Sequence, residues 1–409
     1  METCGIIAEY NPFHNGHRYQ IANVRKRLGA NTGLIIAMSG DFVQRGGPAI
    51  ADKWTRATWA VDHGADLVLE LPVQAATETA ERFAEGGIKL LQALGIVRHI
   101  AFGAETKDLQ LLNDMAAVLS EEPPPFKEAL NQAIADKTGF ADARARALGH
   151  VLGDEAKTLI SRSNAILAVS YLVAMKRQKA KFSPLLIERK GPDELASEKG
   201  EHFASASYIR NVLKKAFHAA KPIEALRLLD VMPSDVLATL MSNGFQDELN
   251  GFERLFPHVL SRLISENKTD LLRFESMRPD LAMRLINMAN ERIDPAAHES
   301  FVNEAATRVY PASRARRALT DLYLGRIKAT EVETPSLIRV LAFSRRGRYL
   351  LKLMKKYASL PIVTRNSDVR ELQGAAKAEL EASQKAADLY ALLLNRRLRS
   401  DFDRTVIIG

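Results

Sequence analysis

Two histidines three residues apart are the first feature of this sequence that could do chemistry. His14 and His17 stand in the stretch "IIAEYNPFHNGHRYQIANVRKRLGA", after an apolar run and a Tyr-Asn-Pro breaker. This pattern predicts a buried strand, a turn and then the first turn of a helix. With nine histidines in 409 residues, a His-x-Gly-His sequence would arise somewhere by composition alone with a chance of about one in a hundred.

Such a pair at the start of a helix suits a phosphate ligand. Residues i and i+3 lie on one helix face, and Gly16 removes a side chain that would keep a ligand from the backbone. Two imidazoles and the free N–H groups of a helix N-terminus can stabilise a phosphate whose charge grows in an in-line transition state. The pattern therefore indicates a nucleotide site. A metal half-site and a polar helix cap are the alternatives, and no third metal ligand is evident nearby.

Strands and helices alternate around this pair. Apolar runs predict strands at 4–10, 33–39, 66–71 and 99–103, and amphipathic stretches predict helices at 15–28, 51–62 and 78–94. Gly29, Gly64 and Gly95 follow those helices, as C-terminal glycines commonly do. The alternation, with right-handed crossovers, predicts an α/β fold with a doubly wound parallel sheet. Ligands of such sheets bind at the carboxyl ends of the strands, where the histidines fall.

The remainder of the chain is predicted to be mostly helical. Residues 107–177 have helical patterns, broken by Glu-Glu-Pro-Pro-Pro at 121–125, and a short strand is expected at 185–188. Beyond residue 218 the pattern is that of helices separated by prolines. We therefore expect two domains: an α/β catalytic domain at 1–218 and an all-helical domain at 219–409.

Composition limits the class of protein further. The chain is 46% hydrophobic and 26% charged, which is ordinary for a globular protein. It contains no apolar run long enough for a membrane helix and no basic leader, so we expect a cytoplasmic location. Its single cysteine, Cys4, lies on the first predicted strand and is expected to be a core residue without metal partners. Composition leaves the oligomeric state open.

Positive charge is concentrated late in the chain. Between residues 309 and 357 there are twelve Lys or Arg against three acidic residues, a local charge of +9 in a chain of +8 overall. Within this region "SRRGRYLLKLMKKY" predicts a helix with a basic stripe flanked by two tyrosines. Such a surface favours single-stranded RNA, although a solvated helix face is the alternative. The stripe consists of Arg345, Arg348, Lys352 and Lys355.

Several segments together resemble a known enzyme family. "HNGH" is similar to the signature of the HxGH nucleotidyltransferase superfamily. In order along the chain, "GIIAEYNPFHNGH", "SGDFVQRGGPAIADKWTRA", "GADLVLELP", "ERFAEGGIKLLQALGI", "FGAE", "FASASYIR" and "IRVLAFSRRGRYLLK" resemble the tRNA(Met) cytidine acetate ligase family. The resemblance implies an HxGH-type Rossmann fold and an ATP-dependent ligase, with Mg²⁺ expected beside ATP. Such an enzyme forms acetyl-adenylate and transfers the acetyl group to N4 of the wobble cytidine of elongator tRNA(Met).

The resemblance also implies site residues. It places His14 and His17 at the phosphates, Asn11 near the reacting carboxylate and Asp41 at the mouth of the site as a catalytic residue. Asp41 could equally be a turn cap. The implied ATP-binding turn consists of Ile7, Ala8, Glu9, Tyr10, Asn11, Pro12, Phe13, His14, Asn15, Gly16, His17, Arg18, Tyr19 and Gln20.

Further ATP contacts are implied outside that turn, and each has a structural alternative. Gly103 could be an ordinary turn glycine, Asn164 a helix cap, and the serines of "SASYIR" a simple N-cap. The implied contacts are Gly103, Asn164, Arg189, Lys190, Ser205, Ser207 and Arg210. The sequence departs from the family pattern at Gly47, where an acidic residue is expected, at Ala104, where serine is usual, and within "SRSNAIL".

Two other functions remain open from the sequence. A small-molecule adenylyltransferase would use the same nucleotide site with the helical half as a substrate or dimerisation domain. A non-catalytic RNA-binding protein is disfavoured because both histidines and the serine-rich motif are present.

Overall fold

The computed structural model describes residues 1–136, 139–189, 196–198, 201–242, 251–291, 294, 297–307, 310–328 and 335–409. Its centre is a sheet in the strand order β10-β8-β3-β2-β1-β4-β5. The five strands β1 (Thr3–Ala8), β2 (Gly33–Ser39), β3 (Leu67–Leu71), β4 (His99–Ala104) and β5 (Ser183–Glu188) are parallel. The α/β class and the parallel arrangement predicted from the sequence are confirmed.

The crossover from β3 to β4 creates the position where a ligand is expected. From β1 the chain adds β2 and β3 on one side through α1 (Asn15–Leu28) and α2 (Lys53–Asp62). It then passes through α3 (Val73–Ala76) and α4 (Ala80–Ala93) and places β4 on the other side of β1. The strand order therefore reverses at β1, and the two histidines lie just after β1, at the N-cap and in the first turn of α1.

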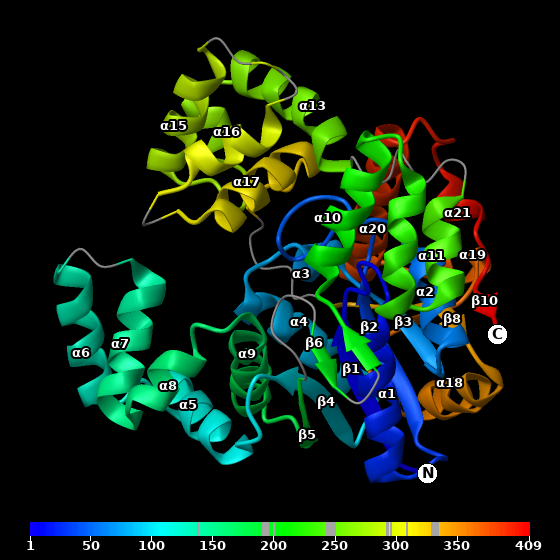
Figure 1. Cartoon of the computed structure of the whole chain (residues 1–409). Coiled ribbons are helices and arrows are strands. Elements are labelled where there is room, and N and C mark those ends of the chain that lie inside the picture. Colours follow the sequence, from blue (N-terminus) through cyan, green and yellow to red (C-terminus); the bar gives the residue numbers. More distant parts are fainter. Residues whose placement is uncertain are drawn as a thin grey trace.

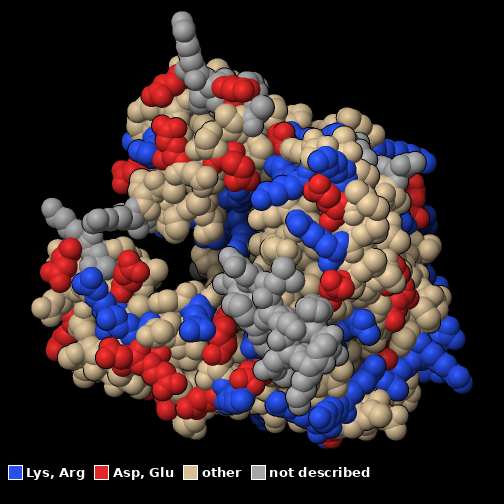
Figure 2. All heavy atoms as spheres, viewed as in Figure 1, with Lys and Arg blue, Asp and Glu red and all other residues tan. Residues whose placement is uncertain are grey.

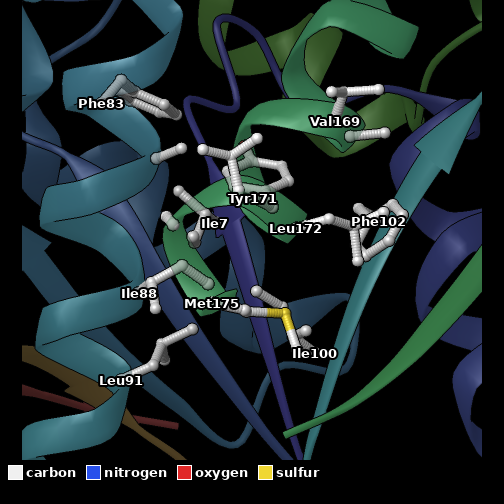
Figure 3. Close-up of a cluster of buried hydrophobic side chains, with 14 of the residues drawn as sticks. Ile7, Phe83, Ile88, Leu91, Ile100, Phe102, Val169, Tyr171, Leu172 and Met175 are labelled. Carbon is white, nitrogen blue, oxygen red and sulfur yellow. The ribbon is translucent and has the colours of Figure 1, made fainter. Parts of the chain in front are cut away.

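Side chains alternate between the two faces of the sheet. On one face Ile7 and Ile100 pack with Phe83 of α4 and Tyr171 of α9 (Ser163–Arg177) in a common core (Figure 3). On the other face Ile6 packs in a core shared with α1, α2 and the later helices α10 (Ala206–His218) and α11 (Ser234–Met241). Figure 1 shows helices on both sides of the strands, so the sheet is doubly wound. Cys4 is a buried core residue, as expected.

The expectation that the chain is all helical beyond residue 218 is wrong in one respect. Three strands, β8 (Ile338–Phe343), β9 (Ile362–Val363) and β10 (Ile407–Ile408), return to the sheet. β8 pairs antiparallel with β3, with Val68 opposite Ala342. A six-residue, mainly apolar segment such as "IRVLAF" fits a buried strand as well as part of a helix, so its periodicity could not decide between them.

The other helices cover the sheet and form two outer layers. One layer lies beyond β4 and β5 and the other, α13 to α17, lies above the body in the view of Figure 1. Their bounds are α5 (Leu109–Glu121), α6 (Pro124–Ala135), α7 (Phe140–Leu152), α8 (Asp154–Leu159), η1 (Pro222–Asp230), α13 (Gly251–Ser265), α14 (Lys268–Leu271), α15 (Pro279–Ala289), α16 (His298–Ala305) and α17 (Ala312–Leu324). The C-terminal elements are α18 (Arg345–Tyr357), α19 (Asn366–Val369), α20 (Gly374–Leu393) and α21 (Ser400–Asp403), and β6 (Ala196–Glu198) pairs with β7 (Glu201–Phe203).

Candidate nucleotide site

The two histidines close the first turn of α1 on themselves. His14 is the N-cap residue, and its Nδ1 accepts a hydrogen bond from the backbone N–H of Gly16 at 3.0 Å. His17 Nδ1 accepts from the backbone N–H of His14 at 3.2 Å, and the two rings stack with centroids 3.8 Å apart. Because a backbone N–H can only donate, both Nδ1 atoms are unprotonated and each neutral ring carries its proton on Nε2. The polar-cap interpretation is thus confirmed, yet each ring keeps one N–H donor for a ligand.

Both imidazoles are held in the neutral form. Burial lowers the pKa of His14 to about 3, with further lowering by Arg189 and Arg210. Burial also lowers the pKa of His17 well below its ordinary value, and His14 and Arg189 add to this effect. The rings therefore act as neutral hydrogen-bond donors, and the positive charge at this end of the sheet comes from the two arginines.

Gly16 is required by the ring of His14. A Cβ atom at this position would lie 2.8 Å from Cε1 and 3.0 Å from Nδ1 of His14. Any side chain would push the imidazole off the backbone N–H that fixes its orientation. The glycine between the histidines therefore keeps the ring in place as well as the ligand path open.

The ends of β4 and β5 supply a second wall. Arg189 follows β5, and its Nη1 donates to Oδ1 of Asn164 at 2.5 Å. Asn164 in turn donates from Nδ2 to Glu105 at 2.6 Å, and Glu105 also accepts from the N–H of Ala165 at the start of α9 at 3.0 Å. Asn164 thus orients Arg189 toward the histidines that it influences electrostatically. Around Gly103 a Cβ atom would meet only one backbone oxygen, at 3.7 Å, so space remains above the strand.

The "SASYIR" segment contributes one arginine and two serines with different tasks. Ser205 is the N-cap of α10 and accepts from the N–H of Tyr208 at 3.1 Å, which is the simple-cap alternative. Ser207 instead accepts from Nη2 of Arg210 at 3.1 Å. Arg210 also donates to the backbone oxygen of Asn11 at 2.6 Å and so fixes α10 beside the histidine turn.

Several members of the turn 7–20 have side chains engaged elsewhere. Ile7 and Phe13 lie in the hydrophobic cores. Asn15 donates to the backbone oxygen of Asp230, and Gln20 donates to that of Ala101. Asn11 accepts from the N–H of Ile50 at 2.7 Å through its Oδ1. The turn is therefore a buried framework whose ligand-facing atoms come from a few of its members, and the individual ATP contacts predicted for it stay predictions. Lys190 lies outside the described residues.

Asp41 belongs to the loop that follows β2, and its side chain is buried. Its Oδ1 accepts from the backbone N–H of Lys53 at 2.8 Å and its Oδ2 is 3.7 Å from Lys53 Nζ. Lys53 also contacts Glu70 at 2.9 Å and Asp401 at 3.1 Å. Burial raises the pKa of Asp41 to about 6, while Lys53 opposes that shift. This arrangement favours a structural role for Asp41, close to the turn-cap alternative. We name the set Asp41, Lys53, Glu70, Arg339 and Asp401 the buried ion cluster.

Two residues that shape the site were not predicted from the sequence. Arg56 is fully buried and donates to the backbone oxygens of Glu9 at 2.7 Å, Ser39 at 3.0 Å and Gly40, so it joins the carboxyl ends of β1 and β2. Glu105 orients Asn164, as described above. Neither carries a recognisable spacing, because their partners come from distant parts of the chain.

The basic stripe on α18 is exposed but distant from the histidines along the sheet. Arg345, Arg348, Lys352 and Lys355 are exposed, while Leu350, Leu351 and Met354 are buried. α18 begins at the amino end of β3, where Ser344 donates to Asp66. The histidine turn lies at the opposite, carboxyl edge of the same sheet. Within the residues described, no group of three potential metal ligands occurs, and no helix is long and apolar enough to cross a membrane.

Comparisons with known proteins show what the whole chain is similar to. Residues 1–404 match the family described as HIGH Nucleotidyl Transferase. A protein of Caldanaerobacter subterraneus is 37% identical over 402 residues, covering 96% of this chain and 95% of its own. One of Acetivibrio thermocellus is 31% identical over the full length of both chains, and both relatives bear the name tRNA(Met) cytidine acetate ligase. The structure of Thermotoga maritima TmcAL bound with alpha-thio ATP superposes with a TM-score of 0.87 at 28% identity, covering 100% of this chain and 99% of that one.

The chain therefore belongs to the HIGH nucleotidyl transferase family. Within it, the full-length similarity places the chain in the tRNA(Met) cytidine acetate ligase family. The resemblance stated from sequence motifs alone is confirmed.

Proposed function

We propose that this protein is an ATP-dependent ligase that acetylates N4 of the wobble cytidine of elongator tRNA(Met). The observation that carries the proposal is the pair of neutral imidazoles at the switch point of the sheet, each with its Nε2–H left for a ligand. The names of the full-length relatives supply tRNA(Met), cytidine and acetate as the substrates. The α-thio ATP bound to the similar T. maritima protein supports ATP as the nucleotide.

In the first step an acetate oxygen attacks the α-phosphorus of ATP. The bond from that phosphorus to the bridging β-phosphate oxygen breaks, and acetyl-adenylate and pyrophosphate form. We assign the Nε2–H groups of His14 and His17, with the N-terminus of α1, to the phosphate oxygens on which charge grows. Neutral donors suit this task because they need no proton transfer during the step.

Arg189 and Arg210 supply the fixed positive charge. Both act on His14 electrostatically, so both stand near the phosphate position. The contact with Asn164 orients Arg189, and the contacts with Asn11 and Ser207 orient Arg210. Held in this way, the two guanidiniums lose little conformational entropy when ATP binds. We propose Asn164 and Ser207 as indirect ATP contacts through these arginines.

In the second step N4 of cytidine attacks the acetyl carbonyl carbon. The bond from that carbon to the AMP oxygen breaks, AMP leaves and the N4 proton passes to solvent. No protein nucleophile is needed, so catalysis rests on positioning and electrostatics. We propose that Asp41 acts in this step only as a positioning residue, because its carboxylate is engaged with Lys53.

We propose Mg²⁺ as the companion of the ATP phosphates and assign no step to it. Mg²⁺ commonly keeps several waters and binds through substrate phosphates with one or two carboxylates. A site of that kind needs no cage of three protein ligands, so it is compatible with the described residues. A cytoplasmic location is part of the same proposal, because that is where ATP and tRNA meet.

The experiment that tests the function measures pyrophosphate release and RNA product together. The protein is incubated with ATP, acetate and elongator tRNA(Met), and nucleosides of the recovered tRNA are analysed by mass spectrometry. A gain of one acetyl group on cytidine that requires both ATP and acetate is expected. Pyrophosphate release without an RNA product would instead favour the small-molecule adenylyltransferase.

A further inference from the structure

A pocket of about 300 Å³ lies beside the histidine turn, between the body of the protein and the outer layer α13 to α17. One wall is the loop 43–50 with Ser207, Arg210 and Lys214 of α10. The opposite wall is formed by the starts of α13 and α16 and by Arg316 of α17. Asn11 lines the pocket, whereas the two histidines, Gly103 and Arg189 are not part of its lining. The pocket therefore shares Asn11 with the nucleotide turn but is not lined by the two histidines.

Glycines hold the two walls at this close distance. Gly46 has φ +82°, and a Cβ atom there would lie 2.7 Å from the backbone nitrogen of Arg317. Gly47 has φ +112° and faces the ring of Phe252 at 3.1 Å. A side chain at either position would be strained and would push the loop away from α17 or α13. The departure at Gly47 noted in the sequence thus belongs to this pocket.

The pocket contains more positive than negative charge. Four cations line it, Arg45, Arg210, Lys214 and Arg316, against the two carboxylates of Glu253 and Glu299. Lys214 is 3.5 Å from Glu253, and Arg316 is 2.8 Å from Glu299, so two of the cations are paired.

The other two cations bond to neutral oxygens in the described part of the chain. Arg45 donates to the hydroxyl of Ser163 at 2.8 Å, and Arg210 donates to the backbone oxygen of Asn11 and to Ser207. Burial lowers the pKa of Arg210; Glu9 opposes this shift, and Arg45 and Arg316 lower the pKa further. Three guanidiniums therefore face a common region with their charge only partly balanced. An anion placed there would relieve their repulsion.

Apolar surface accompanies the charge. The pocket is lined by the apolar side chains of Val43, Pro48, Ile50 and Phe252. The guanidinium of Arg316 stacks over the ring of Phe252, 4.2 Å from the ring centroid. A pyrophosphate ion would leave this apolar surface unused. A nucleotide, with one phosphate and one flat base, matches both kinds of surface. Figure 2 shows Lys and Arg side chains gathered in the recess between the outer layer and the body, where a strand could enter from solvent.

Resting on the proposed function, we propose that this pocket binds a phosphate-linked nucleotide of the RNA substrate, with Arg45 and Arg316 on its phosphate. Because Asn11 lines the pocket, the bound RNA strand would lie beside acetyl-adenylate. The outer layer α13 to α17 then acts in acceptor binding through Arg316. This assignment concerns the second reaction step and leaves acetyl-adenylate formation to the histidine turn.

Two variants with opposite effects on charge test the proposal. Arg316→Gln removes one phosphate contact, and we expect KM for tRNA to rise about tenfold, as for one lost charge-assisted hydrogen bond. The salt dependence of tRNA binding should become shallower by about 0.7 in log-log slope. Glu299→Gln removes the partner of Arg316 and should lower KM for tRNA. Arg316→Lys should restore part of the affinity, and Arg284→Gln, an exposed arginine of α15 outside the pocket, should change nothing.

Acetate-dependent exchange of pyrophosphate into ATP without tRNA separates this proposal from the proposed function. We expect the exchange rate of Arg316→Gln to stay within twofold of the wild type, which also shows that the variant folds. A parallel loss of exchange would assign the pocket to ATP or pyrophosphate and overturn the proposal. An unchanged KM for tRNA in both pocket variants would overturn it as well. Absence of exchange in the wild type would instead contradict the proposed function.

Discussion

His14 and His17 each divide their two ring nitrogens between the helix and the site. The Nδ1 atoms accept hydrogen bonds from backbone N–H groups of the first turn, and the Nε2–H groups remain available to a ligand. A single arrangement therefore provides helix capping, tautomer selection and two aligned donors. This geometry distinguishes histidine from aspartate, whose ionised carboxylate would cap the helix without offering a donor to the ligand.

Replacement of His17 tests its role as a donor. We expect His17→Ala to lower the rate of pyrophosphate exchange by a factor corresponding to about 3 kcal/mol of transition-state stabilisation, as for one lost oxyanion donor. His63→Ala is the matched control, because that ring stacks on Phe13 and pairs with Asp235 near the same turn. Full exchange activity in a folded His17→Ala protein would contradict the assigned role.

The depressed pKa of His14 predicts how stability depends on pH. The unfolded chain takes up a proton near pH 6.5, whereas folded His14 stays neutral down to about pH 3. The contribution of neutral His14 to the free energy of unfolding is complete above pH 6.5. As the pH falls below that value, it is lost by about 1.4 kcal/mol per pH unit. Urea unfolding at pH 7, 6 and 5 should thus show a steeper loss for the wild type than for His14→Gln. The comparison cancels Asp41, whose raised pKa acts with the opposite sign in both proteins. Parallel curves would show that the pKa of His14 is the same in the folded and unfolded states.

The sequence predicted those site residues that are signalled by a short, contiguous stretch of the chain. The spacing of His14 and His17 pointed to the nucleotide turn, and "SASYIR" pointed to Arg210. Glu105 was not predicted because its partner Asn164 is 59 residues away along the chain. Arg56 escaped because its partners are backbone oxygens, which leave no trace in a sequence. Asp41 was predicted at the mouth of the site, and its burial with Lys53 was not foreseen, since nothing local indicated that Lys53 would turn inward.

Among the elements, the loop after β2 is supported by a carboxylate from the far end of the chain. Asp401 lies on α21 and accepts from Nε1 of Trp54 at 2.8 Å. It also contacts Lys53 at 3.1 Å and Arg339 at 2.9 Å, completing the buried ion cluster. Burial alone would raise the pKa of Asp401, but Lys53 and Arg339 outweigh it and lower the pKa to about 2, so Asp401 is ionised at neutral pH. The C-terminal segment is therefore part of the framework of the site.

Removal of that carboxylate should be costly. We expect Asp401→Ala to lower the free energy of unfolding by about 3 kcal/mol or more, because two buried cations lose a partner. Asp403→Ala, an exposed neighbour paired with Arg397, should change stability by less than about 1 kcal/mol. Chemical unfolding monitored by tryptophan fluorescence measures both. Equal stabilities of the two variants would mean that the buried ion cluster does not support the fold.

The elements of the first hundred residues followed from sequence because their signals are short-range. The helix at 15–28 and the strand at 33–39 have the bounds that were predicted. Gly29, Gly64 and Gly95 all have positive φ, as their places after helices required. β8 was missed because its pairing with β3 joins residues 338–343 to residues 67–71. Such long-range pairing has no periodic signature of its own.

Across the whole molecule, positive charge lies at both the amino and the carboxyl ends of the strands of the central sheet. The pocket with Arg45, Arg210 and Arg316 adjoins the carboxyl edge and the histidine turn. The stripe on α18 starts at the amino edge, by Asp66. A tRNA is long enough to reach both, so we propose that the pocket binds near the modified nucleotide and α18 contacts a remote part of the RNA. The division at residue 218 also stays a prediction. β8, which follows that residue in the chain, pairs with β3, which precedes it, so the sheet contains strands from both sides of the division.

Neutralising the stripe should weaken RNA binding without affecting chemistry. In a variant with Arg345, Arg348, Lys352 and Lys355 all replaced by Gln, each lost phosphate contact should reduce the log-log salt slope by about 0.7 to 0.9. The rate of acetyl transfer at saturating tRNA should be unchanged, because α18 is remote from the histidine turn. Filter binding over a range of salt concentrations measures the slope. An unchanged slope would identify α18 as a solvated helix face.

We expect acetate to attack the α-phosphorus of ATP at the histidine turn before the acetyl group reaches RNA. The most direct measurement is a single reaction with acetate labelled with ¹⁸O in both oxygens, followed by mass spectrometry of AMP, pyrophosphate and the modified nucleoside. Attack by acetate leaves one labelled oxygen on AMP for each acetylcytidine formed, with none in pyrophosphate. Label in pyrophosphate or phosphate, or acetylcytidine formed without label in AMP, would contradict the account.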